Sequence, residues 1–316
     1  MARAFAVLAL LSAANTANST YSIVGVDRAE SLAGISIASC VGALDLDIAV
    51  GMAPGSGVVA AQASVDSQFR GRTLAVQLLG EGQPAEAVVD RITVTAVDPN
   101  FQARQYGIAA ITSGGSSEDW TGTNTGAWSG GTHGFDASGR MPYAAQGNIL
   151  TGPGCVAQSE AGFIADPDTL NNATDADKCY DLPARLMRAL IAGTENGEGD
   201  TRCTSRNPPV PVDSAYIRVD LPSGEPWLLL SVVDTYPLSA VDVLYVEYLL
   251  WRAANPCGTA GGNVRAEETA WQPGLEAFRG NATARSFARS RMQAHGTQAA
   301  ETYRRIAAAA HGNISI

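Results

Sequence analysis

The chain has 316 residues, 46% of them hydrophobic and 16% charged, a composition typical of a globular protein with its own core. Its formal net charge at pH 7 is −10, because 31 acidic side chains oppose 21 basic ones. This balance argues against a general nucleic-acid binder, since most polyanions would be repelled.

The first residues are typical of a secretory signal peptide. One positive charge at Arg3 precedes an apolar run over residues 4–11, and small and polar residues follow up to Ser19. The apolar run is too short to span a bilayer, and no later stretch is long enough to predict a transmembrane segment. Two cleavage positions compete: cleavage after Ser19 would free Thr20, and cleavage after Ala14 would leave a short tail before it. We favour the first, which predicts a secreted or periplasmic protein.

Alternating apolar side chains predict β-structure in the first half of the mature chain. The expected strands are residues 21–27, 32–39, 57–64, 106–111 and 117–121. The first two lie on either side of a short polar turn and form a β-hairpin. Two helices are expected before the fourth strand. One covers residues 71–79, and Pro84 opens the other, whose buried stripe is Ala87, Val88 and Ile92.

The second half begins with residues 122–139, which are dense in Gly, Ser and Thr and therefore predict a surface loop. Strands are then expected over residues 144–150, 214–219 and 227–233, and helices over 181–193 and 242–254. The remainder, residues 255–316, is expected to be a helical, Arg-rich extension. We do not expect a separate domain there, because about sixty residues seldom sustain a core alone.

Five cysteines in an exported chain predict one or two disulfides. Cys40 lies in an apolar strand and is expected to be the buried, unpaired thiol. Cys179 and Cys203 flank the helix at 182–193, and we expect them to be bridged. No pair has CxxC spacing, so a zinc site is not expected. No other metal and no cofactor are expected either.

Few residues of this chain can carry nucleophilic catalysis. The only lysine, Lys178, lies in a polar loop, and the three histidines lie in the glycine-rich segment or the extension, where a core cannot hold a triad. No HExxH, P-loop or GxSxG motif occurs. Thr20 remains, because cleavage after Ser19 would place a hydroxyl and an α-amine with a pKa of about 8 on one residue. The alternative is that Thr20 merely follows a processing site.

Seven short motifs occur in order along the chain. They are residues 20–24 (TYSIV), 35–39 (ISIAS), 59–63 (VAAQA), 70–74 (RGRTL), 104–107 (RQYG), 146–150 (QGNIL) and 199–202 (GDTR). Together they resemble the bacterial family catalogued as domain of unknown function ten-twenty-eight, which is placed in the N-terminal-nucleophile (Ntn) hydrolase superfamily. The resemblance runs from Thr20 to about Ala254.

This resemblance implies an α+β fold, a four-layer αββα sandwich with the first strand central and Thr20 at the sheet end. It implies Thr20 as the nucleophile. By position, Ser39 ends the second strand beside Thr20 and is expected to orient the amine, with a strand-capping role equally open. Asn148 is a candidate oxyanion donor, with an ordinary turn-forming role as the alternative.

Two further residues are weaker candidates for holding a substrate. They are Gln62 and Arg70. For Arg70, a structural ion pair with Asp200 is the alternative.

The sequence therefore predicts a signal peptide (residues 1–19), an Ntn-hydrolase-like domain (20–254) and an extension (255–316). The expected function is an exported amidohydrolase acting on a small-molecule or peptide substrate, with no nucleic-acid partner and with homo-oligomerisation left open. The alternative is a catalytically silent module that binds peptide or cell-wall material through the loop around Trp120 and Trp128.

Overall fold

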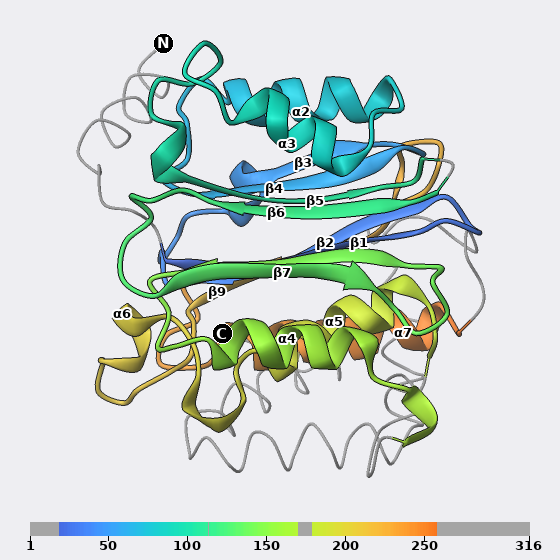
Figure 1. The fold of residues 1–316 in the computed structure, drawn as a ribbon. Coiled ribbons are helices and arrows are strands. Elements are labelled where there is room, and N and C mark those ends of the chain that lie inside the picture. Colours follow the sequence, from blue (N-terminus) through green and yellow to red (C-terminus); the bar gives the residue numbers. More distant parts are fainter. Residues whose placement is uncertain (1–18, 113, 170–178, 258–316) are drawn as a thin grey trace, which may run out of the picture.

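The computed structural model describes residues 19–112, 114–169 and 179–257, and two antiparallel sheets form its centre (Figure 1). The larger sheet has the strand order β10-β9-β2-β1-β8-β7. Its strands are β1 (Thr20–Asp27), β2 (Leu32–Ser39), β7 (Ser129–Phe135), β8 (Pro142–Asn148), β9 (Ser214–Asp220) and β10 (Pro226–Val232). The smaller sheet has the order β3-β4-β5-β6. Its strands are β3 (Val50–Ala53), β4 (Gly57–Ala63), β5 (Arg104–Ala110) and β6 (Ser116–Thr121).

Helices cover the outer face of each sheet (Figure 1). Helices α2 (Arg70–Gly80) and α3 (Ala85–Ile92) lie on the smaller sheet, and α4 (Gly154–Ile164), α5 (Leu182–Ala192) and α7 (Ala240–Ala254) lie on the larger one. Short helical segments are α6 (Thr201–Thr204), η1 (Leu46–Ala49), η2 (Phe101–Ala103), η3 (Pro167–Thr169) and η4 (Glu195–Gly197). The protein is therefore a mixed α/β protein with two antiparallel sheets between helical layers.

Strand β1 is central because both of its faces are apolar and both are covered. Tyr21 and Ile23 pack in the core beneath α4, α5 and α7. Val24 and Val26 belong to the core between the two sheets. Such burial on both faces is typical of a strand in the middle of a layered fold. The predicted hairpin of β1 and β2 is confirmed, and its register pairs Thr20 with Ser39.

Several predicted elements need correction. Residues 122–139 are not one loop, because they contain strand β7. Strand β3 and helix α4 were not expected. In α3 the buried stripe includes Ala85 and Val89 beside Val88 and Ile92, and Ala87 is only partly buried. The expected helices of the extension lie almost entirely outside the described residues.

The disulfide predictions were wrong in their pairing. Cys40 is bonded to Cys203, with 5.7 Å between their Cα atoms, and Cys179 is bonded to Cys257. Cys155 in α4 is the buried thiol, and burial raises its pKa well above the ordinary value. Sequence spacing does not fix connectivity, and here it is the fold that brings the ends of β2 and α6 together.

No helix within the described ranges combines the length and apolar character that a bilayer crossing requires.

Candidate functional site

Five polar side chains lie level with one another across neighbouring strands of the larger sheet. In sheet order they are Ser214, Ser39, Thr20, Asn148 and Ser129. Directly opposed residues in antiparallel strands have their side chains on one face of the sheet. Along β1 this face also carries Ser22 and Val24, so the row faces the smaller sheet.

Thr20 and Ser39 are in contact at the centre of this row. Both are buried, and their side-chain oxygens lie 3.2 Å apart. Ser39 Oγ also donates a short hydrogen bond to the backbone carbonyl of Ser19. The Ser39 hydroxyl is therefore beside both the Thr20 hydroxyl and the peptide bond that precedes Thr20.

Gln62 reaches across from β4 to the backbone of Thr20. Its Nε2 donates to the Thr20 carbonyl at 3.2 Å and to Gln105 Oε1 at 2.9 Å, while its Oε1 accepts from Ser22 at 2.6 Å. Gln146 completes the network by donating to Ser22 Oγ. With its amide engaged by protein groups, Gln62 supports the strand that carries Thr20.

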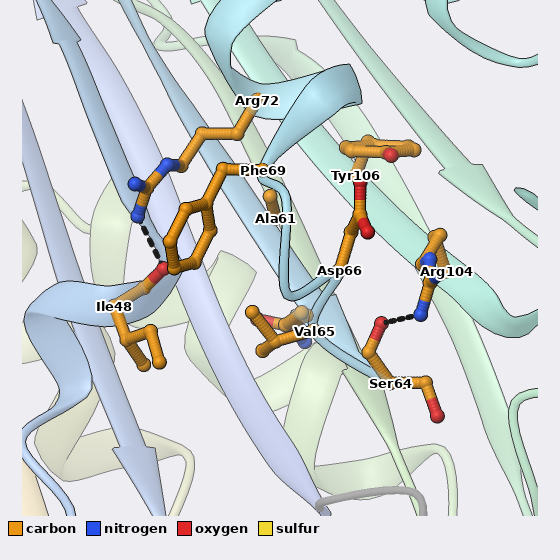
Figure 2. Close-up of a pocket in the computed structure, with 10 residues that line it drawn as sticks. Ile48, Ala61, Ser64, Val65, Asp66, Phe69, Arg72, Arg104 and Tyr106 are labelled. Carbon is orange, nitrogen blue, oxygen red and sulfur yellow. Dashed lines mark hydrogen bonds between the residues drawn. The ribbon is translucent and has the colours of Figure 1, made fainter. Parts of the chain in front are cut away.

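The same glutamine is one of the residues that line a small hollow between η1, β4, α2 and β5 (Figure 2). Figure 2 shows Phe69 and Arg72 on one side of it and Asp66 and Arg104 on the other. Arg72 lies over the Phe69 ring at 4.1 Å. Gln62 is the residue that links this hollow to Thr20.

Arg70, nominated to hold a substrate, is engaged in a cluster of ion pairs. It contacts Asp66 at 2.9 Å and Asp98 at 3.1 Å, and buried Asp98 also binds Arg104 at 2.7 Å. Burial would raise the pKa of Asp66, but hydrogen bonds from Arg70 and from backbone amides lower it to about 2. The expected alternative, an Arg70–Asp200 pair, is wrong because Asp200 pairs with Arg202.

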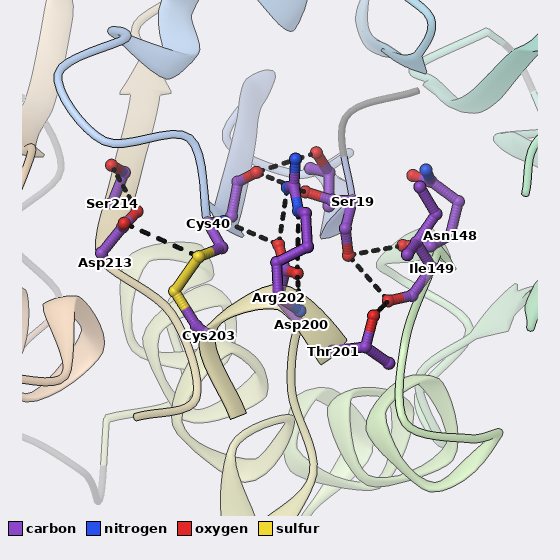
Figure 3. A network of polar contacts seen from close by, with 12 residues as sticks. Ser19, Cys40, Asn148, Ile149, Asp200, Thr201, Arg202, Cys203, Asp213 and Ser214 are labelled. Carbon is purple, nitrogen blue, oxygen red and sulfur yellow. Dashed lines mark hydrogen bonds and ion pairs between the residues drawn. A yellow bond between two sulfur atoms is a disulfide. The ribbon is translucent and has the colours of Figure 1, made fainter. Parts of the chain in front are cut away.

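Arg202 is the site residue that sequence reasoning missed. Its Nη2 donates to the Ser19 carbonyl at 2.9 Å, so that this oxygen has two donors, Arg202 and Ser39 (Figure 3). Asp200 fixes the guanidinium through two hydrogen bonds, Nε–Oδ1 at 3.1 Å and Nη2–Oδ2 at 2.8 Å. The GDTR motif contained both residues, and its Asp-x-Arg spacing was the available signal.

The Ser19 side chain is enclosed on the other side by two carbonyls. Its Oγ lies 2.8 Å from the carbonyl oxygen of Asn148 and 2.9 Å from that of Ile149 (Figure 3). Ile149 has φ 55°, a conformation that is rare for a β-branched residue and is found where surrounding structure enforces it. Thr201 holds this turn by donating to the Ile149 carbonyl from Oγ1 at 3.0 Å and from its amide at 3.2 Å.

Asn148 lies beside Thr20 on the side opposite Ser39, because β1 is between β2 and β8. The side chain is fully buried, and its Nδ2 lies 3.4 Å from the carbonyl of Thr125, at the long end of hydrogen-bond distances. Thr20, Ser39 and Asn148 thus lie side by side in paired strands, and Gln62 contacts the backbone of Thr20. Arg70 pairs with Asp66 and Asp98 instead.

Other chemistry-bearing groups lie elsewhere. His133 on β7 binds Asp119 at 2.8 Å and is partly exposed, four residues along the strand from Ser129. His295 and His311 lie outside the described residues. Among the residues that the structure describes, three metal-type ligand groups come together at Cys40, Cys203 and Asp213, and the two cysteines are bonded to each other.

The chain is similar to one protein family and to a solved structure from it. The sequence profile of a family described as "Family of unknown function (DUF1028)" matches residues 20–237. The chain is also similar to the crystal structure of protein SPO2555 from Silicibacter pomeroyi, a DUF1028 protein, with a TM-score of 0.55 and 22% identity over 77% of this chain and 92% of that one. At this identity the likeness concerns the fold alone. No curated protein matches the sequence.

Proposed function

This chain belongs to the family of unknown function DUF1028, and with that premise we propose that it is an exported amidohydrolase whose nucleophile is a mature N-terminal Thr20. One observation carries the proposal. Next to the Thr20 hydroxyl lies the backbone carbonyl of Ser19, and its oxygen accepts hydrogen bonds from Ser39 and Arg202. Two donors on a carbonyl beside a hydroxyl is the arrangement that acyl transfer requires.

The proposed reaction has two steps. Thr20 Oγ1 attacks the substrate carbonyl carbon while the Thr20 α-amine takes the hydroxyl proton. The amine passes this proton to the leaving nitrogen as the C–N bond breaks, and the acyl group remains as an ester on Oγ1. Water then attacks the ester while the amine takes a proton from it, the bond between the acyl carbon and Oγ1 breaks as the amine returns that proton to Oγ1, and the acid product leaves. Ser39 and Arg202 stabilise the negative oxygen in both steps.

The position of Ser19 supports removal of the leader before the fold closes. Ser19 is fully buried, so the bond between Ser19 and Thr20 lies inside the folded protein. A peptidase would reach it only in the extended chain. Cleavage there would turn a non-basic peptide nitrogen into an amine whose pKa suits neutral pH. The family match also begins at Thr20.

The layered fold is consistent with the Ntn-hydrolase type. Strand β1 is central in its sheet, and Thr20 is its first residue. Helical layers flank the two sheets, in the αββα order that the resemblance implies (Figure 1).

The competing function, a silent binding module, draws less support from the aromatic residues that suggested it. Trp120 packs against Phe101 and Tyr106, with ring centroids 5.6 Å and 6.2 Å away. Trp128 packs against the core beneath the larger sheet. Both rings have packing roles within the fold.

The test is a kinetic comparison of three variants against a panel of peptides, acyl-amino acids and cell-wall fragments. Thr20→Ala should keep the melting temperature and lose hydrolysis. Thr20→Ser should keep part of the activity, because the hydroxyl and amine remain while the methyl that restricts the rotamer is lost. A chain that retains Ser19 should be as inactive as Thr20→Ala. Full activity in Thr20→Ala, or in the chain that retains Ser19, would refute the mechanism.

A further inference from the structure

Ser19 occupies a place that becomes vacant when the leader is removed. We infer that this place receives the acyl half of the substrate, and that the preferred acyl group is small and carries a hydroxyl on its β-carbon, as a seryl group does. The inference rests on the proposed function, because it assumes that Thr20 is the group that is acylated.

The place of Ser19 in the uncleaved chain corresponds to the place of the acyl group in the acyl-enzyme. In the uncleaved chain the carbonyl carbon of Ser19 is bonded to the nitrogen of Thr20. In the acyl-enzyme the carbonyl carbon of the substrate would be bonded to Oγ1 of the same residue. The two positions differ by one transfer from nitrogen to oxygen within Thr20. Groups that surround Ser19 will therefore surround the acyl group.

The carbonyl end of this subsite is formed by two hydrogen-bond donors. Arg202 and Ser39 both donate to the Ser19 oxygen, and Asp200 holds Arg202 in place. Cys40 and Cys203, which are bonded to each other, directly follow Ser39 and Arg202 in the chain. The Cys40 amide also donates to Asp200 at 2.7 Å. Both donors are thus anchored to one covalently linked unit.

The side-chain end of this subsite is formed by two hydrogen-bond acceptors. Ser19 Oγ is within hydrogen-bond distance of two acceptors, the carbonyls of Asn148 and Ile149, at 2.8 Å and 2.9 Å. A carbonyl only accepts, so the group placed between these two must be a donor. Because the Arg202 guanidinium lies in the same site, a neutral hydroxyl suits this position better than an ammonium group, which Arg202 would repel.

The surroundings of Ser19 limit the size of the acyl side chain that fits in its place. Ser19 is fully buried, and the turn beside it is held by two hydrogen bonds from Thr201 to the Ile149 carbonyl. Ile149 itself stays in a left-handed conformation with φ 55°. A larger acyl side chain would have to displace this turn. The subsite is therefore built for a group about as large as a seryl residue.

The preference is tested with ligands, because the acceptors are backbone atoms that no side-chain substitution removes. The probes are N-acetyl-L-serine, N-acetyl-L-alanine and N-acetyl-O-methyl-L-serine. The first has a free β-hydroxyl, the second has none, and in the third a methyl group replaces the hydroxyl hydrogen. Calorimetry measures their binding to exported protein beginning at Thr20, and the three p-nitroanilides measure hydrolysis. We expect the serine compound to bind, and to be hydrolysed, roughly three- to tenfold better than the other two, as one net hydrogen bond allows.

The outcomes separate the inference from the proposed function. Equal binding of the three acids, or no binding of any, overturns the inference. Thr20-dependent hydrolysis of the three anilides at equal rates also overturns it and leaves the amidohydrolase intact. Preferential binding of N-acetyl-L-serine without hydrolysis supports the subsite and overturns the amidohydrolase. Arg202→Lys should weaken the binding, and the control Arg206→Lys should not.

Discussion

The side-chain oxygens of Thr20 and Ser39 lie 3.2 Å apart at adjoining ends of β1 and β2. This contact follows from the register of a hairpin whose first and last residues are paired across the sheet. A hairpin in this register therefore places a second hydroxyl beside the hydroxyl of Thr20.

Ser39→Ala should lower kcat by a factor on the order of 10² while changing KM little, because it removes a donor that acts on the developing oxyanion. The control is Ser36→Ala in the same strand, whose Oγ donates to the Leu186 carbonyl at 2.9 Å. Losing that buried bond should cost about 1 kcal/mol of stability and leave kcat unchanged. Equal kcat in the two variants would remove Ser39 from the mechanism.

Arg202→Lys should lower kcat/KM by at least about tenfold, because lysine cannot bind Asp200 in two places and reach the carbonyl oxygen at once. Arg206→Lys is a matched control. Arg206 binds Asp213 at 2.9 Å, and its side chain is 35% exposed against 33% for Arg202. Steady-state kinetics of both variants provides the measurement. If both substitutions reduce activity alike, Arg202 has only a structural role.

Peptide mapping of exported protein under non-reducing conditions should recover Cys40 linked to Cys203 and Cys179 linked to Cys257, with Cys155 as a thiol. The Cys40→Ser/Cys203→Ser protein should lose stability, because the bridge closes a loop of 163 residues, and such bridges contribute about 2–5 kcal/mol. Its activity should fall too, since Ser39 and Arg202 precede the two cysteines. A Cys179–Cys203 peptide would contradict the structure.

Burial raises the pKa of Glu247 in α7 to about 7 from its ordinary value of 4.5. Between these two pH values the native protein binds more protons than the unfolded chain, so the free energy of unfolding should fall as pH rises. Glu247→Gln should abolish this fall and raise stability at pH 8 by about 1–2 kcal/mol, less than the full shift implies because the residue is partly exposed.

Denaturant titrations from pH 4 to pH 8 measure this effect. The exposed Glu225→Gln variant controls for the loss of one negative charge. An unchanged pH dependence in Glu247→Gln would show that the surroundings of Glu247 do not raise its pKa.

The sequence predicted the elements whose apolar pattern is strong. The hairpin of β1 and β2, helix α2 and strand β4 lie close to where alternation and helical spacing placed them. Strand β7 was missed because its glycines resemble a loop. The structure explains one of them, since a Cβ at Gly131 would lie 2.3 Å from Asp119 and 3.0 Å from the Ala145 carbonyl. Glycine at this position permits the close approach of Asp119 and of the neighbouring strand β8.

The site was predictable in part. Thr20 was a candidate because it follows the expected cleavage position, Ser39 because it ends the second strand, and Asn148 because it follows a glycine within a strand. The register of β1 with β2 and β8 places these three candidates together. The Asp-x-Arg spacing of Asp200 and Arg202 was visible in the sequence, but the contact of Arg202 with Ser19 and the cysteine pairing were not predictable, because both depend on how α6 returns to the end of β2 after more than 160 residues of intervening chain. Spacing along a sequence carries no information on such a return.

The proposed role of Thr20 as an N-terminal nucleophile can be tested by trapping its acyl form. Exported protein is incubated with an acylating β-lactone and digested, and the mass of each peptide is measured. Thr20→Ala keeps an α-amine without the hydroxyl, and a chain retaining Ser19 keeps the hydroxyl without the amine. We expect one added acyl group, on the peptide that begins with Thr20, and none on either variant. Equal labelling of Thr20→Ala, or labelling at another residue alone, would contradict this role.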